Sequence, residues 1–152
     1  MTRGGGAGFA SLNGPLDFDS LLREISAAER AKPAAFPNGA TIGHMHLRVT
    51  DLSRSVRFYH ERLGLDINAY MPEIGAAFLS VGGYHHHLGL NTWHSRGGSG
   101  HRAGDAGLEE LSMILPSAQV VEAVGSQFPR STIQDGRIRL SDPDGIRIEL
   151  SA

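Results

Sequence analysis

The stretch Thr41–Thr50, which reads TIGHMHLRVT, decides the fold that we expect for this chain. In a β-strand, successive side chains point to opposite faces of the sheet. The apolar side chains of this stretch share one face: Met45, Leu47 and Val49. The polar side chains between them share the other face: His44, His46 and Arg48. This pattern predicts a sheet that packs a helix behind it and encloses a polar pocket in front.

The residues after this strand predict a helix and three further strands. Asp51 is a capping residue, the apolar residues of 52–63 recur at helical spacing, and Gly64 is a helix stop. Segments with strand character follow at Asp66–Tyr70, Ala76–Val81 and His85–Asn91. The order of elements is βαβββ, and it forms a first module over residues 41–92.

The same order of elements returns after a connection at 93–107 that is rich in glycine and serine. A second module over 108–151 has these expected elements: a strand at Glu109–Leu115, a helix at Ser117–Gln127, and strands at Ser131–Gln134, Arg137–Leu140 and Ile146–Leu150. The last strand follows Asp142–Gly145, a turn by composition. The sequence therefore predicts an α+β fold over residues 41–152. In it, two βαβββ modules form a curled sheet around a central metal or ligand cleft.

The residues before this domain have a different character. Residues 1–15 are rich in glycine, and we expect them to be disordered. Residues 16–40 predict a short helix and a linker that contains prolines. Three apolar side chains recur there at helical spacing: Leu21, Leu22 and Ile25. We expect a homodimer in which these side chains pack across or near the interface.

The composition excludes several classes of partner and ligand. The chain of 152 residues is long enough for one domain with a core, and its net charge of −2 gives no reason to expect nucleic acid or a membrane surface. There are no cysteines and eight histidines, so a transition-metal site must use imidazole and carboxylate ligands. No apolar run reaches membrane-spanning length and no signal-peptide pattern is present, so we expect a cytoplasmic protein.

Three stretches carry a resemblance to a known family: GHMHLRVTDLSRSVRFYHERLGL at 43–65, GGYHHHLGLNTW at 82–93 and DPDGIRIEL at 142–150. Together they resemble the vicinal oxygen chelate superfamily, which includes glyoxalase I, bleomycin-resistance proteins and extradiol dioxygenases. The chain is most similar to the C-terminal half of bacterial catechol 2,3-dioxygenase-like proteins, and Leu16–Asn38 resembles the linker before that half. The resemblance implies a metal-dependent enzyme that acts on a small molecule.

The resemblance also implies a set of metal ligands. His44 on the first strand and Glu149 on the last strand match ligand positions of the family. The dioxygenases add a second histidine at the start of the fifth strand, where this chain has Glu110, and alternation puts Glu110 on the cleft face with Ser112. A second carboxylate lowers the effective charge of the metal and disfavours ferrous chemistry with oxygen. We therefore expect ring cleavage by the unmodified protein to be weak or absent.

Three consecutive histidines at 85–87 add further candidates. Resemblance to the dioxygenases implies that His86 is a catalytic acid or base, whereas resemblance to glyoxalase I implies that His87 is a catalytic metal ligand. Alternation puts His87 and Asn91 on the inward face, because the leucines between them need the core. The residues expected to line the substrate pocket are His46, His85, Asn91 and Arg139. The residues expected at the surface are His60, His94 and His101.

Three functional classes remain open. The first is a dioxygenase with Fe²⁺ or Mn²⁺ that acts on a catechol-like substrate. The second is a glyoxalase-type lyase or isomerase with Ni²⁺, Co²⁺ or Zn²⁺, whose ligands would be His44, His87, Glu110 and Glu149. The third is a metal-free protein that binds a small molecule, of the bleomycin-resistance kind.

Overall fold

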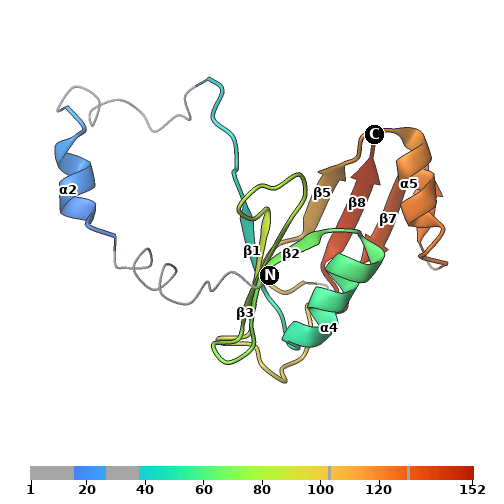
Figure 1. The fold of residues 1–152 in the computed structure, drawn as a ribbon, viewed down its shortest axis with the longest axis horizontal. Coiled ribbons are helices and arrows are strands. Elements are labelled where there is room, and N and C mark those ends of the chain that lie inside the picture. The colour runs from blue at the N-terminus through green and yellow to red at the C-terminus, as the bar shows by residue number, and fades with distance from the viewer. Residues whose placement is uncertain (1–15, 27–37, 103, 130) are drawn as a thin grey trace, which may run out of the picture. The chain divides into compact units, whose positions relative to one another are not determined.

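The structure is a computed structural model, and it describes residues 16–26, 38–102, 104–129 and 131–152. These residues fall into two units that divide after Thr41 (Figure 1), and each unit is considered by itself. The segment expected to be disordered, 1–15, lies outside the described residues. Residues 27–37, which belong to the expected helix and linker, lie outside them as well.

The described part of the first unit contains a short helix, α2 (Phe18–Arg23). Asp17 caps it, because its carboxylate accepts a hydrogen bond of 2.9 Å from the backbone N–H of Ser20. None of the helical residues is buried. The exposed apolar side chains of this region are Leu16, Phe18, Leu21, Leu22 and Ile25. A helix with this surface does not form a core of its own.

The first module of the second unit forms a four-stranded sheet with the order β1-β4-β3-β2. Its elements are β1 (Met45–Arg48), α4 (Leu52–Arg57), the π-helical turn η1 (Phe58–Arg62), β2 (Asp66–Met71), β3 (Ala76–Ser80) and β4 (Leu88–Asn91). β1 and β4 are parallel, and the other pairs are antiparallel. Asp51 caps α4 as expected, because its carboxylate accepts a hydrogen bond from the Arg54 N–H.

The second module repeats this topology with the order β5-β8-β7-β6. Its elements are β5 (Glu110–Ile114), α5 (Ala118–Gly125), β6 (Thr132–Gln134), β7 (Arg137–Ser141) and β8 (Arg147–Ser151). The predicted α+β fold of two βαβββ modules is therefore confirmed. The described strands form two four-stranded sheets, with β1 at the edge of one and β5 at the edge of the other.

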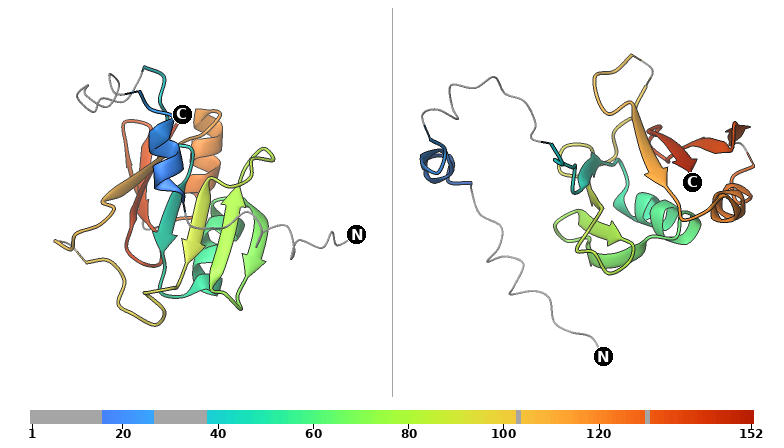
Figure 2. Two further views of the ribbon diagram at one scale, coloured as in Figure 1. Left: turned by 90° about the vertical axis from the view of Figure 1, so that its left-hand side faces the viewer. Right: turned by 90° about the horizontal axis from the view of Figure 1, so that it is seen from above.

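Each sheet packs its own helix, and the two modules share one hydrophobic core. Figures 1 and 2 show α4 on the first sheet and α5 beside β7 and β8 of the second, in agreement with their contacts. Buried side chains from both sheets join in one cluster, including Leu47 and Val49 from β1 and Ile148 and Leu150 from β8. These are the apolar faces that alternation predicted. No helix among the described residues is long and apolar enough to cross a membrane.

The turn between β7 and β8 ties the second module to the first. The Asp144 side chain is 4% exposed, and its carboxylate accepts hydrogen bonds from the Thr50 N–H (3.0 Å) and from Nη2 of Arg54 (2.7 Å). The hydroxyl of Thr50 donates to the same carboxylate, and the hydroxyl of Ser55 donates over 3.4 Å. All three partners lie at the junction between β1 and α4. One side chain of the second module thus satisfies several polar groups of the first.

A second contact of the same turn joins Tyr59 to Asp142. The Tyr59 hydroxyl donates a hydrogen bond of 3.0 Å to Asp142, and both side chains are buried. Burial raises the pKa of the Asp142 carboxyl, although hydrogen bonds from the Ile146 N–H and from Tyr59 oppose that effect. Burial also raises the pKa of the Tyr59 hydroxyl, so this group remains a donor. The carboxylates of this turn therefore accept hydrogen bonds both from a neutral donor, Tyr59, and from a charged one, Arg54.

Candidate metal centre

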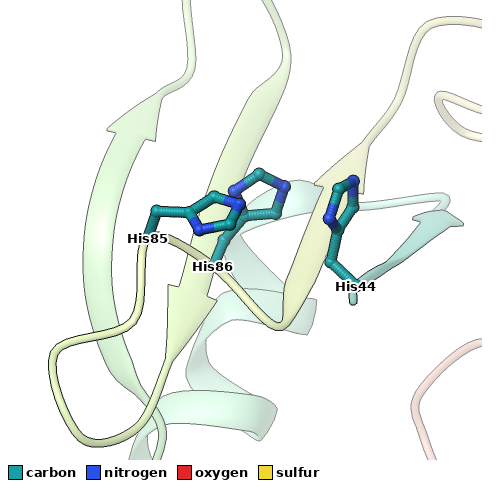
Figure 3. A group of neighbouring side chains, drawn as sticks. All are labelled: His44, His85 and His86. Atoms are coloured by element: carbon teal, nitrogen blue, oxygen red, sulfur yellow. The ribbon is translucent and has the colours of Figure 1, made fainter. Parts of the chain in front are cut away.

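Three histidines gather where the two parallel strands of the first module begin. β1 and β4 pair with Met45 opposite Leu88, so the residues just before each strand lie side by side. His44 stands directly before β1, whereas His85 and His86 stand in the bend before β4. Figure 3 shows the three rings close together, one from the first segment and two from the second. Parallel pairing thus brings together residues that lie about 40 positions apart in the chain.

The spacing of these rings suits a metal ion. One ring nitrogen of each of His44, His85 and His86 lies within 4.8 Å of the others. The ring centroids are 4.4 Å apart for His44 and His86, 4.5 Å for His85 and His86, and 5.8 Å for His44 and His85. Among the described residues, these three are the group of histidine or carboxylate side chains whose potential ligand atoms all lie within 4.8 Å of one another. A fourth ring, that of His46, has its centroid 5.3 Å from that of His44.

His86 has the environment of a metal ligand. Its Nε2 atom is buried and has no hydrogen-bond partner within the described part of the chain. Burial and the neighbouring His44 are the largest causes that lower the pKa of His86 to about 4, so the imidazole is neutral at physiological pH. The Phe78 ring lies 4.6 Å away and covers one side. A neutral imidazole with an unsatisfied buried nitrogen is ready to bind a cation.

Gly89 leaves room for the neighbouring imidazole of His46. A Cβ atom at Gly89 would lie 2.7 Å from Cε1 of His46, so a larger residue would displace the ring. Burial and the nearby His44 lower the pKa of His46, which favours its neutral form. On the polar face predicted for the first strand, the imidazole of His46 thus packs against Gly89 of β4.

Strict alternation does not extend to the three consecutive histidines, because β4 begins only at Leu88. The residues before it form a bend in which Gly82 and Gly83 adopt φ values of 64° and 74°. Period-two alternation does not hold in a bend, so His85 and His86 both join the cluster. The Gly-Gly pair is the sequence signal that could have shown this late start of the strand.

His87 lies apart from the group of three histidines. Its Nδ1 atom accepts a hydrogen bond of 3.3 Å from the Val81 N–H, and its ring packs against Tyr84 with a centroid distance of 4.7 Å. The side chain of His87 lines a cavity of about 440 Å³ together with His44 and Ser112. Most of the other lining residues are apolar and come from both modules. This space is large enough for a small molecule, and His44 stands in its wall.

Among the described residues, Glu149 is not one of the potential ligands grouped with His44. The Glu149 side chain is 8% exposed and lies between two arginines. Nη1 of Arg137 donates to Oε1 over 2.9 Å, and Arg139 donates to Oε2 through Nε (3.0 Å) and Nη2 (2.8 Å). The hydrogen bond from Arg139 is the largest cause that lowers the pKa of Glu149. The carboxylate is ionised and engaged on its own sheet.

Glu110 is likewise outside the group of three histidines within the described part of the chain. It precedes Ser112 by two residues on β5, and its carboxylate lies 4.0 Å from Nε of Arg147. Arg147 also pairs with Glu109. The two carboxylates that the resemblance implied as ligands are those of Glu110 and Glu149. Each of them therefore has an arginine of the second sheet within ion-pair distance.

The residues expected to line the pocket are divided between the two sheets. His46 and His85 belong to the histidine cluster, and Arg139 holds Glu149. Asn91 stands at the end of β4, where its side chain is buried and its Oδ1 atom has no hydrogen-bond partner among the described residues. Sequence reasoning missed Arg137, and it missed Phe78, whose ring packs on His86.

Comparison with known proteins agrees with this fold. A sequence model of the Glyoxalase/Bleomycin resistance protein/Dioxygenase superfamily matches residues 41–150. The chain belongs to this superfamily. Superfamily members commonly bind a divalent metal and act on small molecules. Catechol-2,3-dioxygenase of Bacillus subtilis (strain 168) is 33% identical over 132 residues, which cover 84% of this chain and 45% of that relative. The chain thus spans about half the length of this curated relative.

Solved structures of the superfamily show the same arrangement of elements. A glyoxalase/dioxygenase from Nostoc punctiforme superposes with a TM-score of 0.59 at 17% identity, covering 79% of this chain and 96% of that one. The trypanothione-dependent glyoxalase I of Leishmania major gives a TM-score of 0.56 at 26% identity, covering 74% of this chain and 86% of that one. The superfamily fold is therefore shared with proteins of both dioxygenase and glyoxalase description.

Proposed function

We propose that this protein is a metal-dependent enzyme that uses oxygen to cleave the ring of a catechol-like substrate. The observation that carries the proposal is the grouping of His44, His85 and His86, in which the buried Nε2 atom of His86 lacks a hydrogen bond. The 33% identity to a catechol-2,3-dioxygenase, over 84% of this chain, supports the choice of reaction and substrate.

The donor set fits a divalent transition metal. Imidazole suits iron, nickel and zinc, and three neutral imidazoles leave the full charge of the ion in place. The expectation of weak ring cleavage rested on Glu110 and Glu149 as two anionic ligands. Both carboxylates have arginine partners on the second sheet, which supports a site formed by the histidines without them. A metal held by the histidines would supply Lewis acidity toward a substrate with two adjacent oxygen atoms.

The residues around the group would orient the substrate and move its proton. His46 stands beside the three histidines, and its lowered pKa keeps the ring neutral. A neutral imidazole can accept a proton from a substrate hydroxyl. The mostly apolar cavity beside His44 would exclude water from the aromatic ring of the substrate.

The proposal predicts oxygen-dependent ring cleavage by protein purified without a histidine tag and loaded with Fe²⁺. Catechol and oxygen should disappear in equal amounts as a yellow ring-fission product forms. The Zn²⁺-loaded protein is the matched control, because zinc is redox-inert, and it should be at least 100-fold slower. Absorbance and an oxygen electrode measure the two rates. An Fe²⁺-loaded protein no faster than free Fe²⁺ would contradict the proposal.

A glyoxalase-type lyase or isomerase is the second candidate. The likeness to the Leishmania major glyoxalase I, at 26% identity, favours it. Such a reaction needs no oxygen, and it would run with Ni²⁺, Co²⁺ or Zn²⁺. The two candidates separate under anaerobic conditions, where only the lyase would remain active.

We also propose that the protein is a homodimer with Leu21, Leu22 and Ile25 at or near the interface. The support is the surface of α2, whose residues are all unburied. Sedimentation equilibrium at micromolar concentration should give the mass of a dimer. The Leu21→Glu variant should shift the equilibrium toward monomer, because a charge on an apolar contact opposes association. A wild-type monomer under these conditions would exclude the dimer.

A further inference from the structure

The cavity beside His44 is an unfilled part of the hydrophobic core that the two modules share. Its volume is about 440 Å³. Leu88 of β4 lines it from the first module, and Leu111 of β5 and Leu150 of β8 line it from the second. These three leucines are at most 9% exposed and belong to the shared core. Because protein interiors are close-packed, an apolar space of this size is suited to receive an apolar part of a ligand.

The wall of this cavity offers no partner for an anionic or cationic substituent. Within the described part of the chain, no aspartate, glutamate, lysine or arginine lines it. The polar side chains in the wall are those of His44, His87 and Ser112. A carboxylate, phosphate or ammonium group inside the cavity would lose its hydration without gaining an ion pair. The cavity therefore disfavours a charged substituent and favours an apolar one.

The size of the cavity exceeds the need of a single aromatic ring. An apolar cavity of about 150 Å³ can hold benzene, and this cavity has roughly three times that volume. Two of its lining residues are strongly exposed, Ile42 at 85% and Ile114 at 83%, so the cavity opens to solvent beside them. In the wall from the second module, Met113 and Val124 are partly buried and pack against the core. A ring with a further apolar substituent can thus enter from the surface and be enclosed.

We propose that the substrate is a catechol-like molecule with an uncharged apolar substituent, which occupies the space between the two modules. His44 stands in the cavity wall and also in the group of three histidines, so a substrate whose oxygen atoms approach that group has the cavity beside it. Met113 and Val124 then determine which substituents fit. The catechol part of this inference rests on the proposed function, whereas the apolar part rests on the cavity alone.

Titration calorimetry with matched probes tests this inference. The Zn²⁺-loaded protein does not turn over by the proposed redox reaction, so it can be titrated with catechol and with 4-butylcatechol. The wild-type protein should bind 4-butylcatechol at least about 20-fold more tightly, because each methylene buried in an apolar space raises the affinity by about fourfold. The probe 4-(3,4-dihydroxyphenyl)butanoate, in which a carboxylate ends a chain of similar length, should lose most of this gain.

Two variants with larger side chains in the wall test the place of the substituent. In M113W and in V124F, the preference for 4-butylcatechol over catechol should fall to about threefold or less, because the added atoms fill the space. I133W is the matched control, since Ile133 lies on the same sheet, is 70% exposed and does not line the cavity. This control should keep the full preference. Either of the two wall variants suffices where the other does not fold.

A further measurement separates the cavity from the metal centre. Butylbenzene has no oxygen atoms to bind a metal, and the metal-free wild-type protein should bind it, whereas M113W or V124F should bind it at least tenfold more weakly. Such binding without any affinity of the Zn²⁺-loaded protein for catechols would refute the proposed function and retain the apolar site. Equal affinity of the wild-type protein for catechol and 4-butylcatechol, or an undiminished preference in the folded wall variants, would overturn the inference.

Discussion

Replacing His86 with alanine is expected to abolish metal binding by this protein, with at least a 100-fold loss of affinity for Zn²⁺ or Fe²⁺. The reason is that the buried Nε2 atom of His86 lacks a hydrogen bond, and one ring nitrogen of His86 lies within 4.8 Å of ring nitrogens of His44 and His85. Loss of one of three ligands costs more than loss of a group that merely orients them. His44→Ala should have a similar effect. Metal analysis of untagged protein and Zn²⁺ titration measure both variants.

A matched pair of control variants makes this experiment decide between two ligand sets. His94→Ala removes an exposed histidine outside the cluster, and it should leave metal content unchanged. Glu149→Gln should also retain the metal if the three histidines hold it. If Glu149 is itself a ligand, as the family resemblance implied, that variant should lose metal as fully as His44→Ala. Full metal occupancy in both histidine variants would refute the proposed centre.

Asp144→Ala is expected to lower the free energy of unfolding by about 2–4 kcal/mol. The carboxylate is buried and accepts hydrogen bonds from the Thr50 N–H, the Thr50 hydroxyl and Arg54. Its removal leaves the partly buried donors of Thr50 without a partner. For a domain of about 110 residues, this loss corresponds to a fall in Tm of roughly 10 °C. Thermal unfolding followed by circular dichroism measures the change.

Comparison with Asp144→Asn separates the hydrogen bonds of this contact from its charge. Arg54 is 45% exposed, so the ion pair contributes little and most of the stabilisation comes from the donors of Thr50. The asparagine oxygen can still accept one of these hydrogen bonds, so we expect about half of the loss seen with alanine. Glu122→Ala, at an exposed helical position, should change the stability by less than about 0.5 kcal/mol. An Asp144→Ala protein as stable as that control would contradict the proposed tie between modules.

Local patterns in the sequence determined the elements and their faces. Asp51 correctly indicated the start of α4. The alternation of apolar and polar residues in Thr41–Thr50 distinguished the core side chains from the histidines. The same period put Glu110 and Ser112 on one face of β5. These features depend on backbone dihedrals and on residues a few positions away, so a linear pattern contains them. The family resemblance then added a metal and a reaction class.

The grouping of the site residues was decided by tertiary structure. His44 meets His85 and His86 because β1 and β4 pair in parallel and because a bend delays the start of β4. Glu149 meets Arg139 because β8 lies between β5 and β7, an order that differs from the order of the strands in the chain. Strand order and register arise from contacts across many residues, whereas periodicity reports only which face a side chain takes. The sequence alone therefore determined which side chains are polar and inward, and the fold decided which of them are neighbours.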